Sequence, residues 1–225
     1  MTNTLHRYGN AESFHDDFVI FATPSKAKND EGCVPRLKRF LELAVPFGPI
    51  NAGDTIHGAA LQPSRELSPV VHWKRDATPD FRGLIDSIDT PATVAVVFGN
   101  RAAAEDFLKA LSEADLGLSV NISTSLDGAE QCCHGAGLCR HSVGYSLGFE
   151  GRTEQLPGVP VLLLSTMCGH GMVPATFAGK MIDWVKEGRR TPEQAADYMS
   201  RFCSCGVYNA TRAARILEDA RRRSR

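Results

Sequence analysis

The sequence lacks the patterns that mark membrane-spanning proteins, serine hydrolases and nucleotide-binding proteins. It contains no run of about 20 apolar residues, the length that crosses a bilayer as a helix. It contains no Gly-x-Ser-x-Gly elbow and no Walker loop. Residues 1–17 are polar and lack the apolar core of a signal peptide. The sequence therefore predicts a cytoplasmic protein with no membrane partner.

A strong charge of one sign is also missing. The 25 Lys and Arg residues nearly balance the 26 Asp and Glu residues, which gives a formal net charge of -1 at pH 7. Proteins that bind nucleic acid usually carry a basic excess, so no nucleic-acid partner is expected. A small-molecule substrate is the expected partner, and the sequence leaves open whether a homo-oligomer forms.

Apolar runs alternate with helical segments along most of the chain, and this alternation predicts the fold class. The predicted strands are short apolar runs at residues 18–22, 93–98, 118–122 and 160–165, with a further candidate at 70–73. The predicted helices cover residues 36–45, 102–114 and 174–187 and two segments that begin at Thr191 and Asn209, which are typical capping residues. Residues 93–122 read as a strand-helix-strand unit. We therefore expect an α/β layered fold with a mostly parallel sheet and a helical C-terminal segment.

Ligand-type residues are concentrated in the second half of the chain. Six of the seven cysteines and three of the seven histidines lie between residues 132 and 205. This distribution suggests an N-terminal α/β lobe at residues 1–125 and a cysteine-rich, metal-binding lobe at residues 126–225, although the two can also form one continuous domain. Cys33 stands apart and is expected in the core, where free cysteine packs as a small apolar residue.

Three short motifs place a cysteine one residue away from another metal-ligand type. They are Cys139-Arg140-His141, Cys168-Gly169-His170 and Cys203-Ser204-Cys205. Thiolate and imidazole are the ligands that zinc and iron-sulfur centres favour. A zinc finger would more usually show Cys-x-x-Cys pairs, and the sequence has none. The pattern therefore predicts a metal site, without matching one standard type.

The geometry of the chain restricts where these pairs can lie. Residues i and i+2 point to the same side only in an extended segment, so the ligands are expected on loops or strands, with Cys168 at the end of a strand. Loops that contain Cys132, Cys133, Cys139, then Cys168, then Cys203 and Cys205 are expected to converge on one cofactor. The predicted metal ligands are Cys168, Cys203, Cys205, Cys133 and Cys139, with Cys132 as a further cofactor-binding residue.

Three hypotheses for function follow from these residues. The first is an iron-sulfur enzyme with a 4Fe-4S cluster, in which an iron without a protein ligand acts on a small polar substrate as a lyase or hydrolase. His170 and His134 are its predicted acid-base residues. The second is a zinc-dependent hydrolase that uses Cys168, His170 and a distant cysteine to activate water. The third is a non-enzymatic metal chaperone or redox sensor.

Two further patterns leave alternatives open. The cysteines outnumber the ligands of one cluster, so Cys133 or Cys205 can also serve as a reactive thiol beside the metal. A redox switch between vicinal or near-vicinal cysteines is another possibility, although such a disulfide would be strained. Asn51, Asp54 and His57 crowd a glycine-bearing loop, which is typical of a turn and would also suit a substrate pocket.

Overall fold

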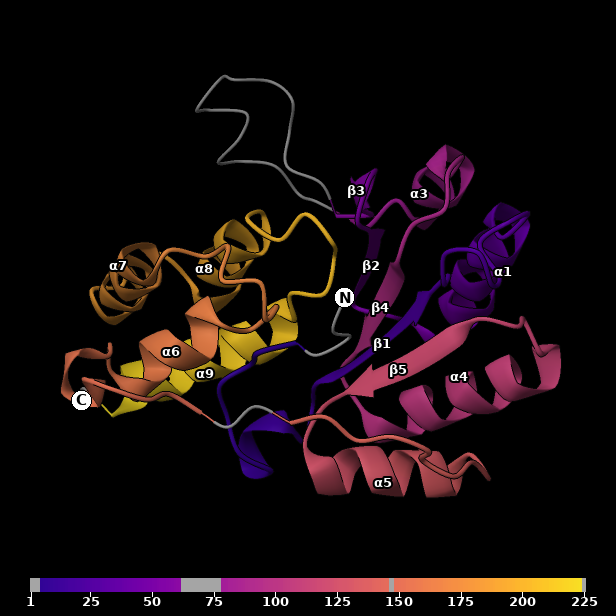
Figure 1. Ribbon diagram of the computed structural model, residues 1–225. Coiled ribbons are helices and arrows are strands. Elements are labelled where there is room, and N and C mark those ends of the chain that lie inside the picture. Colours follow the sequence, from indigo (N-terminus) through magenta and orange to yellow (C-terminus); the bar gives the residue numbers. More distant parts are fainter. Residues whose placement is uncertain (1–4, 62–77, 146–147, 224–225) are drawn as a thin grey trace.

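The computed structural model describes residues 5–61, 78–145 and 148–223 (Figure 1). The candidate strand at residues 70–73 lies outside these ranges. A sheet occupies the centre of the molecule and helices cover both of its faces (Figure 1).

The sheet has five strands, and all of its neighbouring strands are antiparallel. In chain order the strands are β1 (Phe18–Thr23), β2 (Asn51–Asp54), β3 (Gly58–Ala59), β4 (Val94–Phe98) and β5 (Ser119–Ser123). Their order across the sheet is β3-β2-β4-β1-β5. Each neighbouring pair has an antiparallel register, for example Ile20 opposite Val96 and Ile122. The prediction of a mostly parallel sheet is therefore wrong.

The error arises from the position of β1. Strands β4 and β5 run in the same direction and are connected by a helix, as the predicted strand-helix-strand unit requires. However, β1 lies between them and is antiparallel to both. The same holds for β1 and β2, which β4 separates. This interleaving is the split βαβ topology of ferredoxin-like folds, with β3 added beside β2.

Eight α-helices lie in the described ranges. They are α1 (Val34–Ala44), α3 (Phe81–Ser87), α4 (Arg101–Ala114), α5 (Leu126–Gly135), α6 (Val159–Ser165), α7 (Ala175–Lys186), α8 (Pro192–Ser200) and α9 (Ala210–Arg222). The predicted caps are confirmed at the last two: the Thr191 side chain accepts a hydrogen bond from the Gln194 amide, and the Asn209 side chain accepts one from the Arg212 amide. Short 3-10 turns lie at Glu12–Phe14, Val45–Phe47 and Thr153–Gln155.

Side chains alternate across the strands and build a core on each face of the sheet. Ile20 and Val96 point into the core that α1 and α4 cover, where they meet Leu37 and Phe107. Val19 and Val97 point into the opposite core, which α6, α7, α8 and α9 supply. Figure 1 shows these C-terminal helices grouped on one side of the sheet, away from α1 and α4. Cys168, Cys203 and Cys205 belong to the core under the C-terminal helices, and Cys33 and Cys132 belong to the opposite core.

The predicted strand at residues 160–165 is helix α6. Pro160 occupies its first turn, where a missing amide proton costs nothing. Leu164 points into the core shared with α7 and α9, and the half-buried Leu163 packs against it. A short apolar run fits a buried strand or a buried helix equally well by periodicity. As a result, Cys168 follows a helix, and the prediction that it ends a strand is wrong.

A buried polar network joins the start of β1 to the start of α9. The Asp17 carboxylate is fully buried and accepts hydrogen bonds from Arg7, from Arg212 at 2.6 Å and from Asn209 at 3.1 Å. The Arg212 guanidinium also stacks on the Phe14 ring at 4.4 Å from its centre. Because a buried charge is costly without partners, this network fixes α9 against the sheet.

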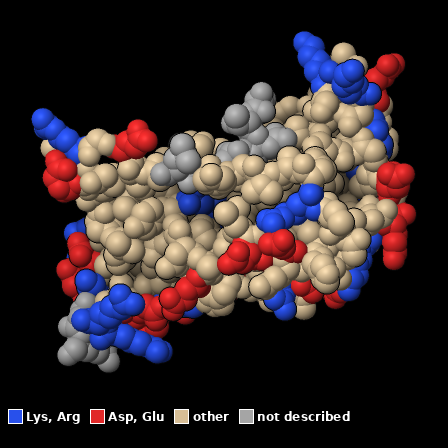
Figure 2. Space-filling model, turned by 60° about the horizontal axis from the view of Figure 1, so that its bottom comes forward, with Lys and Arg blue, Asp and Glu red and all other residues tan. Residues whose placement is uncertain are grey.

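The surface shows two further properties. None of the described helices is both long and apolar enough to span a bilayer. On the face shown in Figure 2, acidic and basic side chains are interspersed.

Candidate metal centre

Four predicted site residues meet where the C-terminal helices rest on the sheet. Cys168 and His170 lie in the turn between α6 and α7, and Cys203 and Cys205 lie in the connection between α8 and α9. The Cys203 and Cys205 sulfurs are 3.6 Å apart, and the Cys205 sulfur is 3.3 Å from Nδ1 of His170. Cys168 interacts with both Cys203 and His170. The four side chains therefore form a closed circle of contacts, which we call the cysteine ring.

The second half of the ring is held by direct backbone contact with the sheet. Gly206 has a φ of +72°, and a Cβ atom there would lie 2.2 Å from the Ala52 carbonyl oxygen. A Cβ atom on Gly53 in β2 would lie 2.5 Å from the Cys205 carbonyl oxygen. Only glycine allows so close an approach of two backbones. The two glycines thus place Cys203 and Cys205 over β2.

The first half of the ring is held by the N-terminal segment. Gly169, between Cys168 and His170, has a φ of +76°, and a Cβ atom there would meet Leu5 at 2.8 Å. Arg7 Nε donates a hydrogen bond to the Met167 carbonyl at 2.8 Å. The Tyr8 amide donates one to the Thr166 hydroxyl at 2.9 Å. The turn that presents Cys168 is therefore fixed against residues 5–8.

The three sulfurs are buried, whereas His170 is exposed. The hydrogen bond with Cys203, followed by burial, raises the pKa of Cys168 to about 12. For Cys203 the hydrogen bond with Cys168 lowers the pKa, but the bond with Cys205 and burial outweigh it and raise the pKa to about 12. The hydrogen bond with Cys203 lowers the pKa of Cys205. Negative charge in the ring is thus favoured on Cys205.

The imidazole complements this charge. Its hydrogen bond with Cys168 raises the pKa of His170 above the ordinary value, even though burial opposes the change. Nδ1 also contacts the Cys205 sulfur. The ring therefore combines soft sulfur ligands with a nitrogen ligand at the surface, a donor set suited to zinc or iron.

Tyr208 forms the floor of the ring and was not predicted from the sequence. Its side chain is fully buried, and its hydroxyl has no hydrogen-bond partner in the part of the chain that the structure describes. Burial, followed by the charges of Cys168 and Cys203, raises its pKa well above the usual value. A buried hydroxyl without a partner is costly. Apart from its place three residues after Cys205, the sequence contains no signal for this role.

The comparisons with known proteins assign no family to the chain. No family model, curated protein or solved structure matches it.

The cysteines and the histidine on α5 do not join the ring. Cys132, Cys133 and His134 lie in α5, so the prediction that Cys132 and Cys133 lie in a loop is wrong. Cys132 is fully buried in the core under α1 and α4, on the opposite face of the sheet from Cys168. Burial, followed by the charge of Glu105, raises its pKa to about 12. His134 is exposed at the end of the helix.

The remaining ligand-type residues are also separate from the ring. Cys133 is half-buried and Cys139 is exposed, and both line a cavity beside β5 together with the exposed His141. Burial raises the pKa of Cys133. Cys33 is buried at the start of α1, as expected for a core cysteine. Only Cys168, His170, Cys203 and Cys205 are thus brought together among the predicted ligands.

The ring is not preformed around an ion. In residues 5–61, 78–145 and 148–223, no group of three or more His, Cys, Asp or Glu side chains is arranged as a ready metal site. The contacts within the ring place the ligands next to one another instead of around a central point. Metal binding would therefore require side-chain rotation, but no backbone rearrangement is needed to bring the four residues together.

The polar loop of the first half has a structural role. The Asn51 side chain accepts hydrogen bonds from the amides of Ala52 at 2.9 Å and Leu61 at 3.0 Å. Asp54 accepts one from the Ile56 amide at 2.7 Å and also binds His57 Nδ1 at 2.7 Å. These bonds close the turn between β2 and β3, which agrees with the turn interpretation.

Proposed function

We propose that this chain is a metal-dependent protein in which the cysteine ring binds a single zinc ion. The observation that carries the proposal is the closed circle of three thiols and one imidazole from two separate connections. Zinc is commonly held by four such ligands in a tetrahedron. The proposed ligands are Cys168, His170, Cys203 and Cys205.

The close packing of the ring favours one ion over a cluster, because only side-chain rotation is needed for these sulfurs to share an ion. With zinc-sulfur bonds of about 2.3 Å, two sulfurs on one tetrahedral ion lie about 3.8 Å apart. The Cys203 and Cys205 sulfurs are separated by 3.6 Å. In a 4Fe-4S cluster each cysteine binds a different iron, which places the sulfurs further apart. The iron-sulfur hypothesis therefore ranks below a single ion, and a lone iron ion in the same four ligands remains its nearest variant.

The proposed ion joins three parts of the fold. It would connect the turn after α6 to the loop before α9, and that loop already rests on β2 through Gly53 and Gly206. Four protein ligands make a closed site, which is typical of zinc that stabilises structure. We therefore propose that the ion holds the C-terminal helices on the sheet.

Metal-bound thiolates would also make the site responsive to oxidation, in the manner of a redox sensor, because the ion keeps the sulfurs deprotonated. A peroxide can oxidise two of the ring thiolates to a disulfide, with loss of two electrons to the peroxide and release of the zinc ion. Cys203 and Cys205 are adjacent in space. We propose a reducing, cytoplasmic location, because the thiols would remain available for metal there.

A zinc-dependent hydrolase is the second candidate, and the exposure of His170 favours it. The three sulfurs are buried while the imidazole reaches the surface. Water that replaced His170 on the ion would be activated for attack on a small-molecule substrate. The observation against this role is that the ring residues do not line the cavity of about 930 Å³ beside β5.

Metal analysis of anaerobically purified protein tests the proposal. Zinc, iron and acid-labile sulfide are measured in the wild type, in Cys168→Ser and Cys205→Ser, and in Cys139→Ser as the exposed control. We expect about one zinc per chain in the wild type and the control, and almost none in the two ring variants. Iron and sulfide in comparable amounts would instead support a cluster.

Zinc content, unfolding stability and ester hydrolysis, measured together on His170→Ala and the wild type, separate the two zinc roles. His170→Ala should lose zinc affinity and stability together if the ion is structural. If it retains zinc and gains an exchangeable water while the wild type hydrolyses a small ester, the hydrolase is supported. Wild-type protein that is fully folded and free of any metal would contradict both roles.

A further inference from the structure

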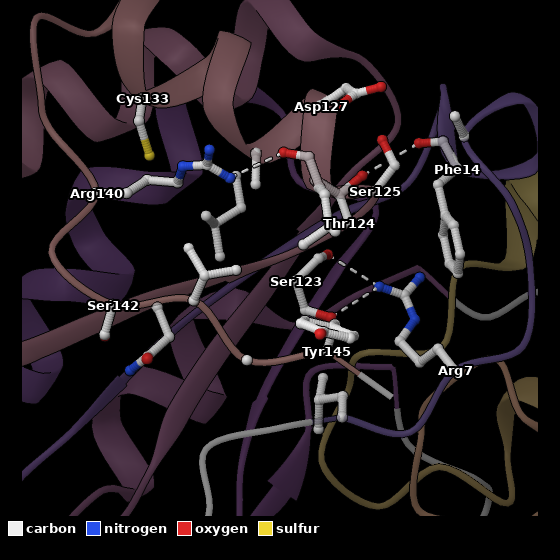
Figure 3. Close-up of a pocket in the computed structure, with 18 of the residues that line it drawn as sticks. Arg7, Phe14, Ser123, Thr124, Ser125, Asp127, Cys133, Arg140, Ser142 and Tyr145 are labelled. Carbon is white, nitrogen blue, oxygen red and sulfur yellow. Dashed lines mark hydrogen bonds between the residues drawn. The ribbon is translucent and has the colours of Figure 1, made fainter. Parts of the chain in front are cut away.

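The outer edge of β5 lies beside a large cavity. Among the described strands, β5 ends the sheet and pairs with β1 alone. The cavity measures about 930 Å³ and is lined by residues 120–124 on one side and by residues 138–145 on the other. Figure 3 labels Ser123, Thr124, Ser125, Ser142 and Tyr145 among the residues that line it. We call this space the β5 groove.

The backbone of β5 is unpaired along the groove. In an antiparallel ladder, alternate residues direct both N–H and C=O away from the neighbouring strand. Among the described residues, no backbone hydrogen bond joins residues 119–124 to residues 138–145. Arg7 satisfies one carbonyl, that of Ser123, at 2.9 Å (Figure 3). The rest of the edge resembles an open template for another strand.

The facing segment runs along β5 without pairing with it. Its attachments are the Leu138 amide to the Cys133 carbonyl at 2.8 Å and Arg140 to the Leu126 carbonyl at 3.1 Å. Residues 141–145 are all exposed. The groove therefore has two walls, one a strand edge and the other an extended segment, with space between them.

The walls carry apolar side chains and an unpaired amide. Val120, Leu126, Val143 and Tyr145 all line the groove and are exposed, Tyr145 to 65%. The side-chain nitrogen of Asn121, at the centre of β5, is buried and has no hydrogen-bond partner within the described part of the chain. Because this nitrogen is shielded, a carbonyl oxygen of an occupant would remove this cost once the Asn121 side chain turns toward the groove.

The charges of the lining disfavour an anionic occupant, because the exposed Asp127 carboxylate also lines the groove. Both arginines of the lining are already neutralised, Arg7 by Asp17 and Arg140 by Glu130 at 3.0 Å. An anionic small molecule would have to displace one of these partners. An extended peptide with apolar side chains needs no such exchange, because backbone groups and apolar contacts bind it.

We propose that the β5 groove binds an extended, uncharged peptide segment of a partner protein, which pairs with β5 as a sixth strand. Five residues of strand are about 17 Å long at about 3.4 Å per residue, so a segment of about this length fits. A second copy of this chain is a poorer occupant. Its sheet edge would have to displace residues 138–145 to reach β5, whereas a single strand fits between the walls.

Peptide binding measured by fluorescence anisotropy and by amide hydrogen exchange tests this proposal. The probe is a fluorescein-labelled peptide of alternating threonine and valine with blocked ends. The matched control is the same peptide with alternate backbone nitrogens methylated on one edge, which keeps the side chains but removes the hydrogen bonds. We expect a dissociation constant below about 1 mM for the probe and at least about tenfold weaker binding of the control.

Two variants locate the site. Asn121→Val removes the unpaired amide and should weaken probe binding by about threefold or more, and Tyr145→Asp should weaken it through the opposite wall. With the probe bound, amide exchange should slow in residues 119–124 of the wild type. Equal binding of the methylated control, or exchange that slows only elsewhere, would overturn the proposal. So would a concentration-dependent dimer, seen by light scattering, that protects residues 119–124 without any peptide.

Discussion

The cysteine ring and the cysteines around α5 look alike in the sequence but differ in the fold. Both contain a Cys-x-His motif, Cys168-Gly169-His170 in one and Cys139-Arg140-His141 in the other. In the ring, buried sulfurs contact each other and an imidazole. Around α5, one cysteine lies in the core, one is half-buried and one is exposed. The same motif thus has two structural outcomes.

The difference shows that what surrounds a motif decides whether its side chains converge. The ring lies in two turns that glycines hold against Leu5 and against β2. Cys132 and Cys133 lie on a helix, where neighbouring residues point about 100° apart. One sulfur therefore enters the core while the next faces the β5 groove. The following predictions test whether the two regions differ in function as they do in geometry.

Removal of metal should produce the largest effect. If free zinc exceeds its dissociation constant about a thousandfold, the bound ion stabilises the fold by about 4 kcal/mol. A chelator should therefore lower the unfolding midpoint of the wild type and of Cys139→Ser. It should not change that of Cys205→Ser, which has already lost the ion. A chelator effect that persists in Cys205→Ser would place the metal outside the ring.

Alanine at two glycines with the same backbone conformation should have unequal effects. Gly206 and Gly137 both have a φ of +72°, but only at Gly206 would a Cβ atom collide with backbone, whereas nothing lies within 4 Å at Gly137. Gly137→Ala should cost about 1–2 kcal/mol through its positive φ. Gly206→Ala should cost about 3 kcal/mol or more and also lower metal content. Urea unfolding measures both, and similar values would mean that the loop is not pressed on β2.

Replacement of each of the two adjacent cysteines of α5 by serine should have unequal effects on stability, because one lies in the core and the other faces the β5 groove. Cys132→Ser places a hydroxyl in an apolar core and should cost about 1–3 kcal/mol. Cys133→Ser is half-buried and should cost less than about 0.5 kcal/mol. Neither should change metal content. If either variant lost metal without unfolding, the α5 cysteines would have to be ligands after all.

The smallest expected effect is a pH dependence of stability. It arises in the β2–β3 turn, beside the ring. The hydrogen bond with Asp54 raises the folded-state pKa of His57. A raised pKa means that the stabilisation is fully present below about pH 6.5 and is lost as the pH rises through the folded value. His57→Gln should therefore be less stable than the wild type at about pH 6 and nearly equal at high pH, by less than about 1 kcal/mol. A difference that grows with pH would contradict this assignment.

The local elements were largely predictable, and the arrangement of the sheet was not. The β-branched run of β4, the composition of α4 and the caps Thr191 and Asn209 are local signals, and each is confirmed. The insertion of β1 between β4 and β5 depends on pairing between residues about 75 to 100 positions apart. Local patterns carry no information on such pairing. The short apolar helix α6 had no periodicity long enough to separate it from a strand.

The residue types of the candidate site were predictable, but the individual residues that come together in it were not. Thiols and imidazoles one residue apart indicated a metal site, and Cys168, Cys203 and Cys205 do lie together. The separation of the α5 cysteines depends on the helix itself, which the i, i+2 argument did not foresee. Tyr208 and Gly53 contribute through tertiary contacts alone. Neither residue carries a sequence signal for the site.

Zinc K-edge X-ray absorption of anaerobically purified wild-type protein tests the central claim most directly. One ion in the cysteine ring predicts a coordination shell of three sulfurs at about 2.3 Å and one nitrogen at about 2.0–2.1 Å. His170→Ala, loaded with excess zinc to offset its weaker affinity, should exchange that nitrogen for a water oxygen and keep the three sulfurs. A shell of nitrogen and oxygen alone, or a sample whose metal is iron with iron–iron scattering, would contradict a single zinc ion held by Cys168, His170, Cys203 and Cys205.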